Sequence, residues 1–172
     1  MRRFVLCAAI GVLAVGGLCG TMTAQAQSKD EQEIRALEDR FVAAFNAKDL
    51  DAMMKLYVHS NDLVVFDLGT PRQHVGWEDY RKDWQDTFAG IKGPANFRIT
   101  DLSIEADGKL AYSHSIQHGT FAGPDGNPME MAVRVTDVYR KVNGEWLIVH
   151  EHVSVPIDFS GPKPMPDMMS KP

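Results

Sequence analysis

The amino-acid sequence predicts an α+β fold in which three N-terminal helices pack on one face of a curved antiparallel sheet. Apolar residues recur at helical spacing only in the first part of the chain, up to about residue 91. From residue 96 onward, alternating apolar and polar residues are separated by turn sequences, which is typical of strands. Helices followed by a run of strands indicate an α+β architecture with the helices on one side of the sheet.

The helices follow from spacing and capping residues. Ser28 and Glu31 have the spacing of a capping box, and the apolar stripe after them predicts a helix over residues 30–46. Asp49 is placed to cap a short second helix that carries Leu50, Met53, Met54 and Tyr57. A third helix with an aromatic stripe begins at Trp77 and is ended by Gly93-Pro94. Its stripe comprises Trp77, Tyr80, Trp84, Phe88 and Ile91.

The strands follow from alternation and turns. A short buried strand is predicted over residues 63–67 and a loop over 69–76. Four longer strands are predicted over residues 96–105, 109–121, 129–142 and 145–156. Asn143-Gly144 is a strong signal for a two-residue hairpin turn between the last two strands.

Residues 1–26 have the features of a secretory signal peptide. A basic start precedes an apolar run from Phe4 to Leu18, and Ala24-Gln25-Ala26 resembles a cleavage site. The apolar run is too short for a membrane anchor. We therefore expect a periplasmic or secreted protein, with one domain over residues 27–159. The Pro- and Met-rich residues 160–172 are expected to be a disordered tail.

Charge and cysteine content narrow the classes of function. Removing Arg2 and Arg3 changes the formal net charge from −5 to −7, and the remaining chain has no cluster of Lys and Arg. Nucleic acids and anionic membrane surfaces are therefore poor partners. Cys7 and Cys19 both lie in the leader, so the mature chain has no disulfide, thiol nucleophile or cysteine metal site.

The order of elements and the ending TDVYRKVNGEWLIVHEHVSVP resemble the nuclear transport factor 2-like superfamily, in its SnoaL-like or ketosteroid-isomerase-like branch. The ending is also similar to the association domain of calcium/calmodulin-dependent kinase II. This resemblance implies a cone-shaped domain over roughly residues 30–158. It leaves the function open, because the superfold carries both enzymes and non-catalytic scaffolds.

Alternation predicts which side chains face the inside of the cone. On residues 129–139 the odd positions are apolar except for Asp137. On residues 110–118 the bulkier set is even and contains Tyr112, His114 and His118, so this set is expected to face inward. On the last strand the apolar set is odd, and Glu151 is its single charge.

Polar exceptions on apolar faces are the candidate catalytic residues. A buried charge is costly unless it is paired or functional, and two nearby carboxyls cannot both ionise easily. Asp137, Glu151 and His114 are therefore predicted to converge as an acid/base site for proton abstraction next to a carbonyl. The alternative is a structural ion pair of these carboxyls with His114 or Arg72.

Several other residues are predicted to bind the substrate. Asp67 ends a strand before a glycine loop, where it is either a turn cap or part of the mouth of the cone. The tryptophans of the third helix either line the pocket or belong to the plain core. The predicted binding residues are Tyr57, Asp67, Trp77, Trp84, Tyr112 and His118. The Asp and Tyr/Asp site that ketosteroid isomerases use does not map onto this chain residue by residue.

His150 and His152 share one face of the last strand, opposite Glu151. A metal site there lacks further ligands on that face, so no metal and no other cofactor is predicted. These histidines are instead assigned to a homodimer surface with Arg134, Thr136, Trp146 and Ile148.

The predicted function is binding of a small, largely apolar organic molecule, with acid/base catalysis of the isomerase, cyclase or lyase kind. The alternatives are a non-catalytic binding or oligomerisation module and, third, a His-ligated metalloenzyme.

Overall fold

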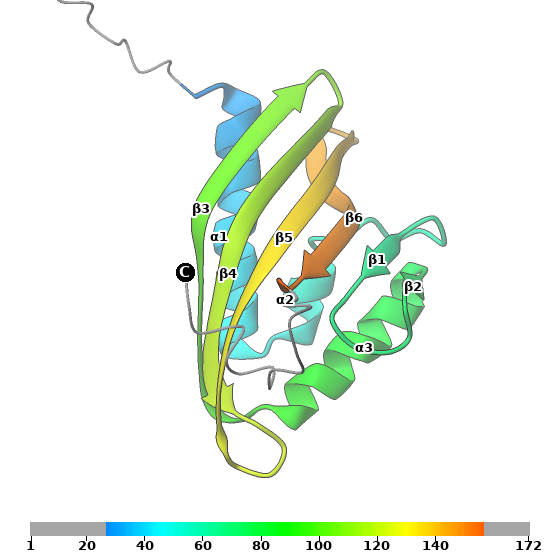
Figure 1. The fold of residues 1–172 in the computed structure, drawn as a ribbon. Helices are drawn as coiled ribbons and strands as arrows, with labels where there is room; N and C mark the ends of the chain where they lie inside the picture. Colours follow the sequence, from blue (N-terminus) through cyan, green and yellow to red (C-terminus); the bar gives the residue numbers. More distant parts are fainter. Residues whose placement is uncertain (1–26, 157–172) are drawn as a thin grey trace, which may run out of the picture.

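A computed structural model describes residues 27–156 of the chain (Figure 1). The predicted leader and the predicted tail lie outside these residues. The elements in chain order are α1 (Lys29–Ala47), α2 (Leu50–Met54), β1 (Val64–Phe66), β2 (His74–Val75), α3 (Trp77–Gly90), β3 (Lys92–Asp107), β4 (Leu110–Ala122), β5 (Pro128–Val142) and β6 (Glu145–Ser154). Within residues 27–156, no helix combines the length and apolar character that a membrane span needs.

The helices begin where the capping residues predict. Ser28 and Glu31 form a reciprocal capping box, each side chain accepting a hydrogen bond from the other's backbone N–H. Asp49 caps α2 by accepting a hydrogen bond from the backbone N–H of Ala52. Helix α2 ends at Met54 and does not include Tyr57. Tyr57 instead forms an isolated bridge with Ile148.

The sheet has six strands in the order β2-β1-β6-β5-β4-β3. Strands β3 to β6 pair antiparallel, as the sequence predicts, whereas β1 lies parallel to β6. The sheet is therefore mixed, and the short β2 forms within the stretch that was expected to be a loop. Asn143 and Gly144 both have positive φ (52° and 92°), as a type I′ hairpin turn requires.

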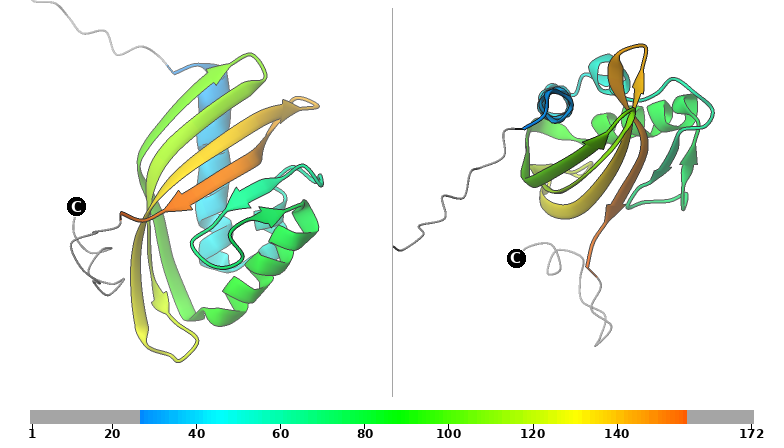
Figure 2. Two further views of the ribbon diagram at one scale, coloured as in Figure 1. Left: turned by 45° about the vertical axis from the view of Figure 1, so that its right-hand side comes forward. Right: turned by 90° about the horizontal axis from the view of Figure 1, so that it is seen from above.

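The sheet curves around α1, which lies along its inner face, while α3 lies beside β1 and β2 (Figures 1 and 2). The core fills the space between these helices and the sheet, with Ile34, Leu37 and Phe41 from α1 almost fully buried. Together the parts form an unclosed cone, and the predicted α+β fold class is confirmed.

A β-bulge interrupts the pairing of β5 with β6. Asp137 pairs with Glu151 and Val138 pairs with His150, but Tyr139 pairs with Ile148, so Val149 is an extra residue on β6. The inner face of β6 therefore changes from even to odd positions at Val149.

Candidate functional site

The inner face of the sheet together with α1 and α3 encloses a cavity of about 440 Å³ that opens to solvent. The tip of the β4–β5 hairpin approaches the end of α3 here: a Cβ added at Gly90 would lie 3.6 Å from Pro124. Most of the wall is aromatic or aliphatic, including Phe41, Phe45, Trp84, Phe97, Phe121 and Val133. Such a pocket suits a small, largely apolar molecule.

Glu151 is the buried carboxyl group of this cavity. It lines the cavity although its residue is only 3% exposed. The Tyr57 hydroxyl donates a hydrogen bond to Oε2 at 2.8 Å, and the Tyr80 hydroxyl donates one to Oε1 at 2.7 Å. These contacts join the segment after α2, helix α3 and strand β6, and they hold the carboxyl group in one orientation.

Two further carboxyl groups lie behind Glu151. Asp137 on β5 is its pairing partner in the sheet and is also buried. Glu38 on α1 accepts a hydrogen bond of 2.5 Å from the hydroxyl of Tyr139, which also contacts the Ser113 hydroxyl at 2.7 Å. Oδ1 of Asp137 and Oε2 of Glu38 are buried without a hydrogen-bond partner in the described residues.

Burial shifts the acidity of all three carboxyl groups in the same direction. It raises the pKa of Glu151 to about 7; the negative charge of Asp67 adds to the rise, and the hydrogen bonds from Tyr80 and Tyr57 oppose it. Burial likewise raises the pKa of Glu38 to about 7, against the hydrogen bond from Tyr139. The pKa of Asp137 is raised well above its ordinary value by burial, and then by the charges of Glu38 and Glu151.

Asp137, which has carboxyl neighbours on both sides, is made harder to ionise, whereas a pKa of about 7 allows Glu151 to exchange its proton near neutral pH. A carboxyl group with a pKa near neutrality is suited to take up and return a proton during catalysis. Of the three, only Glu151 lines the cavity.

Three of the predicted substrate-binding residues lie in or next to this site. Asp67 and Trp84 line the cavity, and Tyr57 reaches it through Glu151. Trp77, by contrast, turns away from the cavity. Its indole N–H donates to the carbonyl of Met54 and its ring stacks on His59 at 4.2 Å. The placement of Trp77 in the pocket was therefore wrong.

The expected orientation of β4 was also wrong. Ser113 pairs with Asp137 and Gln117 pairs with Val133, so the odd positions of β4 face inward. Tyr112 and His114 are exposed and His118 is half-buried, all on the outer face. His114 is therefore not part of the carboxyl cluster, and neither Tyr112 nor His118 lines the cavity. The bulky set was mistaken for the inner set because the outer face of this sheet also carries apolar side chains.

Two residues of the predicted dimer surface also face inward rather than outward. Trp146 and Ile148 are buried inside the cone, 4% and 0% exposed, because they precede the bulge at Val149. Arg134, Thr136 and His152 do lie on the outer face, where they are exposed.

Glu38 and its hydrogen-bond partner Tyr139 were not among the residues predicted for the site. Glu38 lies within the apolar stripe of α1, one turn from Ile34 and next to Leu37. A charged residue inside such a stripe was the available signal.

His150 and His152 lie on the opposite side of β6 from Glu151. Nδ1–H of His150 donates to the carbonyl of Val64 at 2.7 Å. Both imidazoles pack edge-on against Phe66, with centroids 5.1 and 5.5 Å away. Residues 27–156 contain no group of three or more His, Cys, Asp or Glu side chains arranged to hold a metal ion.

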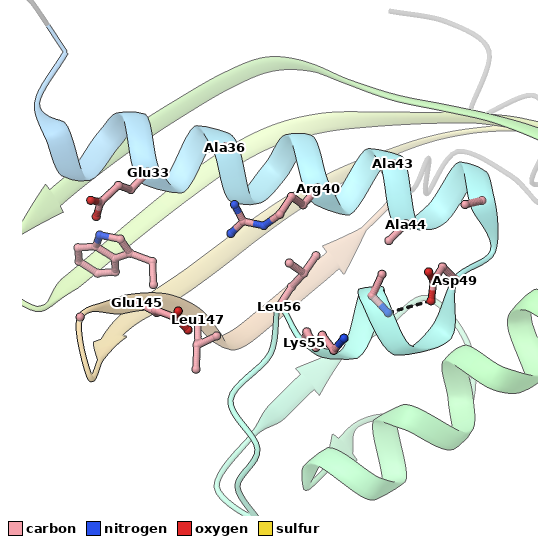
Figure 3. Close-up of a pocket in the computed structure, with 14 residues that line it drawn as sticks. Glu33, Ala36, Arg40, Ala43, Ala44, Asp49, Lys55, Leu56, Glu145 and Leu147 are labelled. Atoms are coloured by element: carbon pink, nitrogen blue, oxygen red, sulfur yellow. Dashed lines mark hydrogen bonds between the residues drawn. The ribbon is translucent and has the colours of Figure 1, made fainter.

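A second hollow, of about 870 Å³, lies outside the cone between α1, α2 and the β5–β6 hairpin (Figure 3). Arg40 extends from α1 into it, and much of its wall is alanine, including Ala36 and Ala43. Although this groove is larger, it contains none of the buried carboxyl groups. The buried carboxyl group of Glu151 lines the smaller inner cavity instead.

Comparisons with known proteins agree with the fold. Residues 34–158 match the family model of the SnoaL-like domain. A nuclear transport factor 2-like protein of unknown function from Pseudomonas putida is 30% identical, with a TM-score of 0.68 over 76% of this chain and 89% of that chain. A search of curated proteins gave no match.

Two more distant structures show the same fold. A ketosteroid isomerase-like protein from Erwinia carotovora is 21% identical, with a TM-score of 0.64 over 74% of this chain and 97% of that chain. A protein from Xanthomonas campestris described as a calcium/calmodulin-dependent protein kinase II association domain is also 21% identical. Its TM-score is 0.63 over 76% of this chain and 89% of that chain. The fold, the matched range and the relative from Pseudomonas together place this chain in the SnoaL-like family of the nuclear transport factor 2-like superfamily.

Proposed function

We propose that the inner cavity binds a small, largely apolar organic molecule and that Glu151 acts on it as a general acid/base. The observation that carries this proposal is the state of Glu151. It is a buried carboxyl group on the wall of an apolar cavity, it is held by two tyrosines, and its pKa is raised to about 7. A surface carboxyl group with an ordinary pKa would be a far weaker base.

The reaction class that fits is proton transfer at a carbon next to a carbonyl, as in an isomerase, cyclase or lyase. Ionised Glu151 removes the proton, and the resulting carboxylic acid returns it to another atom of the bound molecule. Tyr80 lines the cavity and donates to Glu151, so its hydroxyl is placed to steady the carboxylate before the transfer. Burial and its carboxyl neighbours raise the pKa of Asp137, which opposes the accumulation of negative charge beside Glu151.

Solvent-deuterium exchange into a simple carbon acid tests this function without knowledge of the natural substrate. We expect the protein to accelerate exchange at the α-carbon of 2-tetralone, an apolar bicyclic ketone, with a rate that rises as Glu151 ionises. Glu151→Gln keeps the shape of the side chain but cannot accept the proton. It should reduce the enzymatic exchange about 100-fold while binding changes little, as measured by NMR and calorimetry.

The matched control is Tyr112→Phe, which also removes one polar group but on the outer face of the sheet. Its exchange rate should equal that of the unmodified protein. Binding of the ketone without any acceleration of exchange would contradict catalysis and favour a non-catalytic binding module.

The outer face of the sheet supports a second role, in self-association. Leu110 and Tyr112 are 53% and 43% exposed on β4, and Ile116 lies on the same face. Neighbouring apolar side chains on an exposed sheet favour a partner, and two-fold pairing of identical chains is the commonest arrangement. We propose a homodimer through this face.

We also propose that the domain works outside the cytoplasm. The basic start, the apolar run and the Ala24-Gln25-Ala26 sequence support export with cleavage after Ala26.

A further inference from the structure

The inner cavity has an asymmetric distribution of charge. Four carboxyl-bearing residues line it, namely Asp67, Asp83, Asp86 and Glu151. Of the lining residues in the described part of the chain, none is Lys, Arg or His. The cavity therefore presents negative charge and apolar surface, without a fixed positive charge in its wall.

The cations around the cavity leave this negative charge incompletely balanced. Lys82 pairs with Asp86, and Nε2 of His74 lies 3.5 Å from Asp83. Asp67 accepts a hydrogen bond from the backbone N–H of Leu68 at 2.6 Å, and it has no cationic partner within residues 27–156. The negative charge of Asp67 also acts on two other carboxyl groups of the cavity, since it contributes to raising the pKa of both Asp83 and Glu151.

The charged groups and the rings occupy different parts of the same space. The side chains of Asp83 and Asp86 are 29% and 65% exposed, so they stand where the cavity meets solvent. Further in, Phe45 stacks on Phe97 with centroids 4.3 Å apart, and Trp84 meets Phe45 edge-on at 5.9 Å. An occupant therefore meets acidic groups at one end and aromatic surfaces at the other.

Two residues of the cavity wall carry polar side-chain groups. Trp84 is 7% exposed, and its indole N–H is buried with no acceptor among the described residues. Gln117 lines the cavity at 6% exposure and adds a side-chain amide to the wall. A ligand with hydrogen-bonding atoms therefore meets polar as well as aromatic groups in this wall.

We infer that the ligand of this cavity is a cationic amine: an apolar, ring-containing body seated against the aromatic wall, with a protonated nitrogen held near Asp67 and Asp83. This inference rests on the proposed function of the cavity and names the chemical class of its ligand. A protonated amine places its N–H donors toward carboxylates, and aromatic faces attract the same charge. A carboxylate ligand of the same size would instead be repelled by Asp67 and Asp83.

Three probes with the same ring and different charge test this preference. These are 2-(2-naphthyl)ethylamine, 2-(2-naphthyl)ethanol and 3-(2-naphthyl)propanoate, titrated against the full mature protein by calorimetry near neutral pH. We expect the amine to bind at least about fivefold more tightly than the alcohol, and the propanoate to bind most weakly.

Asp67→Asn and Asp83→Asn should each reduce the ratio of amine to alcohol affinity while leaving the affinity for the alcohol unchanged. Glu78→Gln is the matched control, because it removes one negative charge from the exposed first turn of α3 outside the cavity lining. The ratio of amine to alcohol affinity in this variant should equal that of the unmodified protein. This control separates the local effect of Asp67 and Asp83 from an effect of the net charge of the protein.

The outcomes distinguish the two proposals. Equal affinity for amine and alcohol, or an amine preference that survives both Asn variants, would overturn the cationic ligand class and leave the apolar binding cavity standing. Failure of all three probes to bind would count against this inference and against the proposed binding function together.

Discussion

At the scale of single residues, the molecule concentrates its unusual chemistry in three buried carboxyl groups. Glu151, Asp137 and Glu38 come from two adjacent strands and the helix that packs on them. The hydrogen-bond partners of Glu151 are the hydroxyls of Tyr57 and Tyr80, and that of Glu38 is the hydroxyl of Tyr139. A hydroxyl partner satisfies a carboxyl oxygen without adding positive charge, so burial dominates and the carboxyl groups hold protons up to near neutral pH.

These raised pKa values make stability depend on pH. The pKa of Glu38 rises from 4.5 to about 7 on folding, so between these values the unfolded chain releases a proton that the folded chain keeps. The free energy of unfolding therefore falls as pH increases across this interval and changes little from this group outside it. A shift of this size corresponds to at most about 3 kcal/mol.

Glu38→Gln removes this group's contribution, because glutamine does not ionise. We expect chemical unfolding to show a smaller loss of stability between about pH 5 and about pH 8 in the variant than in the unmodified protein. The remaining slope reflects Glu151, whose pKa is raised in the same direction. Glu31 is unsuitable as a control because it caps α1, so the exposed Glu78→Gln serves instead. If Glu38→Gln left the dependence of the unfolding free energy on pH unchanged, the raised pKa of Glu38 would be contradicted.

At the scale of elements, the bulge at Val149 decides what β6 presents to the interior. It allows Trp146 and Ile148 to pack in the core at one end of the strand while Glu151 faces the cavity at the other. In a regular strand of the same sequence, without the bulge, alternation would put Glu151 and Ile148 on opposite faces. Bulges next to functional sites commonly reorient a side chain in this way.

A pair of alanine substitutions checks this switch of faces. Ile148 is fully buried, whereas Leu147 is half-buried on the other side of the strand. Ile148→Ala should lower the free energy of unfolding by about 2–5 kcal/mol through lost burial and a new cavity. Leu147→Ala should lower it by less than about 1.5 kcal/mol, as measured by denaturant unfolding. The opposite ranking would mean that the bulge is not where the structure has it.

At the scale of the whole molecule, the two faces of the cone differ in their side chains. Its inside forms an acidic, aromatic cavity, and its outer sheet surface carries the exposed apolar residues of β4. Because the two faces belong to opposite sides of the same strands, a change on one face need not alter the other. Self-association and ligand binding should therefore be separable by mutation.

The double variant Tyr112→Lys with Ile116→Lys tests the proposed dimer. Placing two like charges on each copy of a two-fold interface should shift the protein to a monomer in light scattering, while ligand binding in the cavity persists. Val75→Lys is a control, since Val75 is 49% exposed on β2 at the opposite edge of the sheet. An unmodified protein that is monomeric at micromolar concentration would exclude this dimer.

Local sequence signals are enough to predict most of the fold. Capping residues, helical spacing and the Asn143-Gly144 turn predict the three helices and four long strands to within a few residues, because these signals are local. Alternation on β5 also places Asp137 correctly on the inner face, because β5 pairs with β4 without a register shift. The polar exceptions Asp137 and Glu151 could therefore be singled out before their neighbours were visible.

The residues that lie beside Asp137 and Glu151 depend on tertiary contacts. The inner face of β4 is set by its register with β5, not by the bulk of its side chains, so Ser113 and Gln117 replace His114 and His118 inside. The bulge at Val149 and the parallel pairing of β1 with β6 depend on contacts between distant segments. Glu38 joins the site from 101 residues before Tyr139. Periodicity describes one strand or helix at a time, whereas burial and pKa depend on what packs against it.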